Sequence, residues 1–234
     1  MLNQFSRAVM DAETPLAESD ALNAVAPLNT PSNQQIINAS KQAYAQHQAA
    51  VDAMTIALVN IISSGSQIDA ITHLDSLNWL SPGISAEVVD PIYNAPQVVA
   101  AITAAGKDPA LRSFSVGVFS NALPGGNIGT IGFDRNLGST ASTGSTLTLD
   151  LYKNTVSTQL GSNLQLGLWL KEAGALHDDV IGLYIATTVQ SVPINLKLLL
   201  TPSLAPYGFI VSAGATVNIP VTTAVFAGET ATWP

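Results

Sequence analysis

In the second half of the chain, apolar side chains recur at every second position. The alternation is clearest in three leucine-rich segments, residues 147–151, 164–170 and 192–200. A period of two places successive side chains on opposite faces of a β-strand, so each segment predicts a strand with one buried face. We expect the leucines to face the core. The uncharged polar residues between them, such as Gln165 and Asn195, are expected to point outward.

Further strands are predicted where short apolar stretches lie between Gly, Pro, Ser and Asn residues. They cover residues 114–119, 128–133, 180–189, 207–213 and 216–221. Because no helical segment interrupts them, the predicted strands indicate an antiparallel β-sandwich that is jelly-roll-like.

The first half of the chain follows a helical pattern instead. A long helix is predicted from Ser32 to Gly65, since Gln35 stands three residues after Ser32 as in a capping box, and Gly65 can end a helix. Shorter helices are predicted at 66–80 and 96–106.

These patterns divide the chain into three parts. We predict an extended arm at 1–30, a helical region at 31–110 and a β-sandwich domain at 111–234. The predicted fold class is therefore α+β and mainly β, with a helical N-terminal region followed by the sandwich.

The long helix carries a broad apolar face. Tyr44, Val51 and Leu58 recur every seven residues, and alanines flank them. This face could pack on the same chain or on a helix of another subunit, and composition does not decide between the two. The three residues are therefore candidate interface residues.

Charged residues are scarce throughout the chain. Asp, Glu, Lys and Arg make up 10% of the residues, whereas a soluble domain usually has about 25%. The surface is then either covered by other protein or built from uncharged polar residues, and both point to assembly. The net charge is −8 and the eight basic residues are scattered, which disfavours nucleic acid as a partner.

Other features bound the location and chemistry of the protein. The chain has no Cys, which excludes disulfides, thiol nucleophiles and Cys-ligated metals. Asp11 and Glu13 interrupt the only apolar stretch near the N-terminus, so synthesis in the cytoplasm without a signal peptide is expected. The most apolar segment, 49–62, is shorter than the ~20 residues that span a bilayer, which disfavours a membrane partner.

No motif indicates catalysis, a cofactor or a metal. The glycine-rich stretch 125–132 lacks the spacing of a nucleotide-binding loop and is predicted to form a hairpin turn. The adjacent residues His177, Asp178 and Asp179 cannot all point at one ion, so a solvated turn is predicted. His47 lies on the seam of the long helix, as a core histidine would. We therefore expect no enzyme activity, no cofactor and no metal site.

Two tryptophans are further candidates for contacts. Trp169 is out of phase with the leucines around it, so it is predicted to point outward, where a Trp is a contact candidate. Trp233, next to the C-terminal Pro234, could anchor the tail to a neighbour.

These features favour a structural, self-assembling protein, most concretely a virion coat, decoration or other particle component. Its expected partners are further copies of itself, in a homo-oligomer, and other particle proteins. The main alternative is a pore-forming or membrane-active toxin, in which residues 138–162 would form an amphipathic hairpin. A glycan- or ligand-binding sandwich, resting on Trp169 and a few exposed tyrosines, is the third.

Overall fold

The structure of the protein, a computed structural model, describes most of the chain. The described residues are 2–12, 32–64, 86–123, 127–139, 144–150, 163–213 and 223–233.

The described helices all precede the strands. They are α1 (Leu2–Met10), α3 (Asn33–Ser64), α5 (Ala86–Tyr93) and α6 (Pro96–Ala105). The helix α3 confirms the predicted long helix, and α6 confirms the helix predicted at 96–106, whereas the sequence pattern does not predict α5. The helix predicted at 66–80 lies outside the described residues.

The start of α3 follows from its sequence. The Ser32 backbone N–H donates a hydrogen bond to Gln35 Oε1 over 2.9 Å, which is one half of the predicted capping box. The helix is kinked at His47, whose backbone angles (φ −114°, ψ 16°) are not helical.

The strands form one closed, antiparallel barrel. They are β1 (Ser113–Leu123), β2 (Asn127–Asn136), β3 (Gly144–Asp150), β4 (Asn163–Trp169), β5 (Asp179–Val189), β6 (Val192–Leu200), β7 (Pro206–Ala213) and β8 (Thr223–Trp233). Their order around the barrel is β1-β2-β3-β8-β5-β6-β7-β4, and β4 pairs with β1 to close it. Each half is a Greek key, because β4 returns to lie beside β1, and β8 returns to lie beside β5.

The predicted α+β, mainly β class is thus confirmed, while a jelly-roll-like sandwich is not confirmed. A sandwich consists of two separate sheets, each with edge strands. Here each described strand is hydrogen-bonded to two neighbours, so the described strands form a single closed sheet. The strand predicted at 216–221 lies outside the described residues, and the sequence pattern does not predict β8.

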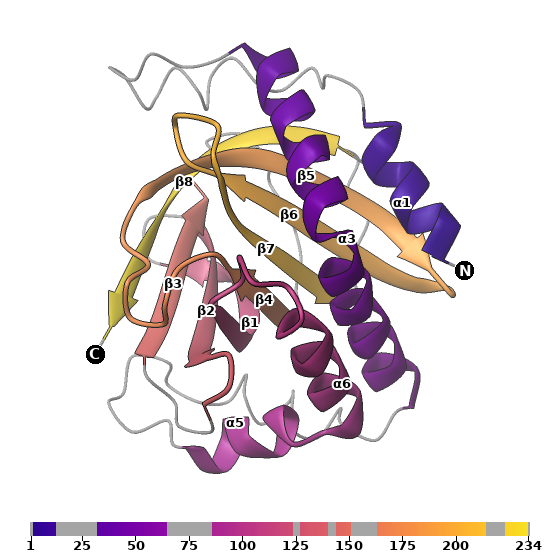
Figure 1. Ribbon diagram of the computed structural model, residues 1–234, viewed down its shortest axis with the longest axis vertical. Helices are drawn as coiled ribbons and strands as arrows, with labels where there is room; N and C mark the ends of the chain where they lie inside the picture. Colours follow the sequence, from indigo (N-terminus) through magenta and orange to yellow (C-terminus); the bar gives the residue numbers. More distant parts are fainter. Residues whose placement is uncertain are drawn as a thin grey trace.

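The leucines of the strands face the helices. Leu166 of β4 and Leu196 of β6 are fully buried in one cluster with Val51 and Leu58 of α3. Figure 1 shows α3 crossing β5, β6 and β7, with α1 and α6 packed beside it. The prediction that the leucines face the core is confirmed for the segments 164–168 and 192–200, whereas the leucine side chains of 147–151 lie outside the described part of the chain. Helices and strands share this cluster, so the change of pattern near residue 110 is a change of secondary structure within one core.

The opposite face of the strands lines the barrel interior. Gln165, Ser212 and Asn195 are register partners across β4, β7 and β6, so they share this face. The side chains of Tyr207 on β7 and Thr230 on β8 form a 2.9 Å hydrogen bond. Because β7 and β8 are not neighbours in the barrel, this bond crosses the barrel interior.

The prediction that Gln165 and Asn195 point outward is therefore wrong. Gln165 is 1% exposed and Asn195 is 7% exposed. Alternation reports two different faces, but it does not say that the polar face meets water. In this barrel one face of the strands is covered by helices. The other is enclosed, and there Gln165 and Asn195 share the interior with a second apolar cluster that includes Trp169 and Phe226.

Candidate functional site

Trp169, the last residue of β4, lies in the barrel interior. It points away from the leucines, as its phase predicts, but that direction leads into the barrel, and the side chain is 1% exposed. Its Nε1–H donates to Ser115 Oγ over 3.0 Å, and its ring meets the Tyr207 ring edge to face. In this chain Trp169 is therefore a packed interior residue and is not exposed for contact with a partner.

Glycines make the room that Trp169 occupies. A Cβ at Gly208 would collide with the Trp169 ring, and a Cβ at Gly167 would collide with Ser115 Oγ. A Cβ at Gly182 would likewise collide with the Leu198 carbonyl oxygen. The chain itself thus fills the space around Trp169, so this residue gives no support to a glycan- or ligand-binding sandwich.

A cluster of polar residues lies at one end of the barrel. Lys171 forms an ion pair with Asp178, whose backbone N–H donates to Thr230 Oγ1. Burial acts to raise the pKa of Asp178, but hydrogen bonds from Lys171 and Tyr207 outweigh it and hold the pKa below its usual value. These contacts fix the segment before β5 on the barrel.

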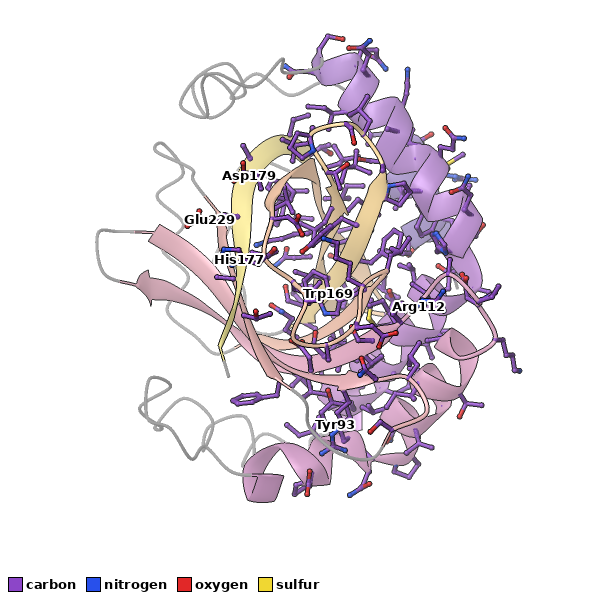
Figure 2. The ribbon with its side chains drawn as sticks, turned by 60° about the vertical axis from the view of Figure 1, so that its left-hand side comes forward. Tyr93, Arg112, Trp169, His177, Asp179 and Glu229 are labelled. Carbon is purple, nitrogen blue, oxygen red and sulfur yellow. The ribbon has the colours of Figure 1, made fainter. Side chains whose placement is uncertain are left out.

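The residues beside this ion pair are exposed. His177, Asp179 and Glu229 lie on the side of the barrel away from α3 (Figure 2), and Asp179 and Glu229 are register partners. Among the described residues, no group of three or more His, Asp and Glu side chains is placed to hold a metal ion.

His47, which is buried, and Asp108, which is half-buried, form a pair between α3 and the segment after α6. His47 Nδ1 lies 2.6 Å from Asp108 Oδ2, and the His47 ring packs on Phe209 of β7. Burial acts to raise the pKa of Asp108, but hydrogen bonds from His47 and the Ala110 N–H outweigh it and hold the pKa below its usual value. The pair ties the kink of α3 to the end of α6, which is a structural role.

This pair predicts a pH-dependent loss of stability in Asp108→Asn. The pKa of Asp108 is lower in the folded chain than in the unfolded chain, so the ionised carboxylate stabilises the fold. This stabilisation is fully present above the unfolded pKa of about 3.9, and it is lost as the pH falls through the folded pKa. We expect the free energy of unfolding of the variant to be about 1 kcal/mol below that of the parent at pH 7. At pH 3 the difference between the two proteins should be smaller.

Urea denaturation at pH 3, 5 and 7 measures this difference. The control is Glu172→Gln, which removes an exposed carboxylate elsewhere. A deficit for Asp108→Asn that does not shrink between pH 5 and pH 3 would contradict the linkage.

The predicted interface residues of the long helix are buried within their own chain. Tyr44, Val51 and Leu58 are at most 1% exposed and pack against the strands and the other helices. In this single chain the apolar side of α3 therefore packs on the strands and helices of its own chain. Trp233 ends β8, and its side chain lies outside the described part of the chain.

The exposed face of α3 was not among the predicted interface residues, although the sequence already shows that Lys41 and Asp52 are the only charged residues of this helix. The two charged residues of this helix are Lys41, which is half-buried, and Asp52, which is buried. Every exposed position of the helix is uncharged: Gln34, Gln35, Asn38, Gln42, Ala45, Gln46, Gln48, Ala49, Ile56, Asn60, Ser63 and Ser64. On α6 the large apolar Val99 is also exposed. The sequence pattern that indicates this face is the run of Gln, Asn and Ala between the apolar positions, because these uncharged residues are the ones that remain for the exposed side of the helix.

Two findings complete the description of the chain. Within the described ranges, no helix is long and apolar enough to span a membrane. Comparison with protein-family models, curated proteins and solved structures finds no match.

Proposed function

We propose that this protein is a structural component that assembles with further copies of itself, most concretely as a virion coat, decoration or other particle protein. In this role it acts through protein contacts and not by catalysis. Its place is then the assembled particle, where other particle proteins are further partners.

The exposed face of α3 carries this proposal. Surface helices of soluble proteins usually place charged residues toward water, yet no exposed position of this 32-residue helix is charged. Side chains such as Ala45, Ala49 and Ile56 can be covered by another protein without burying a charge. A face of this kind suits permanent coverage better than contact with water.

The barrel supports the particle reading by analogy. Two Greek keys also make up the jelly roll of many capsid proteins, although a fold does not determine a function. The hairpin of the toxin alternative gains no support, because the described part of it, Gly144–Asp150, is β3 and pairs with β2 and β8 inside the closed barrel.

A pair of charges on α3 tests the proposal. In Ala45→Glu/Ala49→Lys the new side chains stand four residues apart, where they support the helix, and the net charge of the chain is unchanged. Burying them in a contact would cost desolvation energy, so we expect association at least tenfold weaker, which is about 1.4 kcal/mol. The melting temperature should stay near that of the parent, because both positions are exposed.

The matched control is Ala45→Gln/Ala49→Gln, which changes the same positions without charge. Sedimentation velocity over a range of concentrations measures association of the parent and both variants. Equal association of all three would remove the α3 face from the proposal, and a parent that never associates would contradict the proposed function itself.

A further inference from the structure

The helix α1 packs against a surface of α3 and β5. We call this surface the seat, and on α3 it includes Tyr44 and Gln48. Phe5 and Val9 are fully buried, and the Phe5 ring meets the Tyr44 ring edge to face with centroids 5.8 Å apart. The main described contacts of α1 are to β5 and α3. Figure 1 shows α1 beside α3 at the outside of the molecule. A helix of nine residues is marginal on its own in water, so α1 depends on this seat.

A chain of hydrogen bonds also links α1 to the seat. Gln48 Nε2 donates to Ser6 Oγ over 3.1 Å, and Ser6 Oγ lies 3.0 Å from the Tyr44 hydroxyl. The Tyr44 hydroxyl in turn donates to Asp52 Oδ1 over 2.7 Å. Asp52 is buried, and burial raises its pKa, although hydrogen bonds from Tyr44 and Gln48 act against this. Removal of α1 would expose the apolar seat to water and break the hydrogen bonds through Ser6. The seat is therefore stable only when a helix occupies it.

The connection between α1 and α3 is long enough for that occupant to come from another copy. Nineteen residues separate Ala12 from Ser32. A segment of that length spans up to about 65 Å when extended, well beyond the radius of gyration of about 17 Å expected for a domain of this size. The α1 of one copy can therefore reach the seat of its neighbour.

We propose that, in the assembled protein, α1 of one copy occupies the seat on α3 and β5 of a second copy. This inference rests on the proposed function. Exchange of an identical element preserves the contacts of Phe5, Ser6 and Val9, so the two arrangements differ mainly in chain entropy and local concentration. The high local concentration inside an assembly favours the exchange, and each exchanged helix ties two copies together.

Single cysteines placed on separate chains test the exchange. The natural chain has no Cys, so Ser6→Cys and Gln48→Cys introduce the only thiols. The two variants are mixed, assembled and treated with a short bismaleimide. We expect a covalent dimer carrying one chain of each variant, because Ser6 and Gln48 are in contact across the seat.

Two controls make the result decisive. Ser63→Cys replaces Gln48→Cys in the first, since Ser63 lies about 22 Å further along α3 and should give no cross-link with Ser6→Cys. The second is the double variant Ser6→Cys/Gln48→Cys, which must cross-link in either arrangement: between chains if α1 exchanges, and within one chain if it does not.

The failures of the two proposals can be told apart. Cross-links confined to single chains of the double variant, in a protein that light scattering shows to be assembled, would overturn the exchange and leave the proposed function standing. Cross-links confined to single chains of a protein that stays monomeric would overturn both.

Discussion

Leu196→Asp is expected to yield no cooperatively folded protein. Leu196 is fully buried in the cluster between β6 and the helices. An unpaired carboxylate at such a position costs several kcal/mol, and the cavity left by the leucine adds to the loss. The sum is comparable with the whole stability of a domain, about 5–15 kcal/mol. Far-ultraviolet circular dichroism during thermal melting checks this result.

The control places the same side chain where it meets water. Thr188→Asp lies at an exposed position near the end of β5 and should change stability by no more than about 0.5 kcal/mol. Near-native melting of Leu196→Asp would contradict the burial of the leucine face under the helices.

Charge introduced at Gln165 is expected to have the second-largest effect. Gln165 lines the barrel interior, and its Oε1 has no hydrogen-bond partner among the described residues. Gln165→Glu and Gln165→Lys should each lose roughly 2 kcal/mol or more at pH 7, because each buries a charge. We test a negative and a positive side chain because a neighbouring charge could stabilise one of them but not both.

The two variants should also depend on pH in opposite directions. Burial raises the pKa of a glutamate, so the deficit of Gln165→Glu should grow as the pH rises above about 4.3. Burial lowers the pKa of a lysine, so the deficit of Gln165→Lys should grow as the pH falls below about 10.

Chemical denaturation at a series of pH values measures both slopes, with Gln165→Leu as the uncharged control. This control removes an amide oxygen that lacks a partner and adds no charge, so it should lose less stability than either charged variant. A position that faces water would tolerate all three substitutions equally, which would contradict an enclosed polar face.

The local elements were predictable from the sequence because local patterns determine them. The period-two leucines around Leu166 and Leu196 identify strands, and Ser32 with Gln35 identifies the start of α3. By contrast, β8 is a run of small and polar residues whose alternation is weak, and its strand forms because β3 and β5 flank it. Barrel closure depends on such distant pairings, which no window of sequence contains.

The residues of the candidate site were harder to predict for a related reason. Whether the polar face beside Gln165 and Trp169 meets water depends on closure of the barrel, so both residues were expected on the outside. The pair of His47 and Asp108 joins residues 61 positions apart, and neither has a local pattern that points to the other. The uncharged side of α3 could have been read from the sequence once the buried side was known.

The mass of the natural protein in solution tests the central claim most directly. Contacts made by uncharged side chains are screened far less by salt than ion pairs are. Size exclusion coupled to light scattering should therefore show the same oligomeric mass in low salt and in molar salt. A monodisperse monomer in both buffers at high protein concentration would contradict assembly, and an oligomer that dissociates in molar salt would contradict contacts through an uncharged surface.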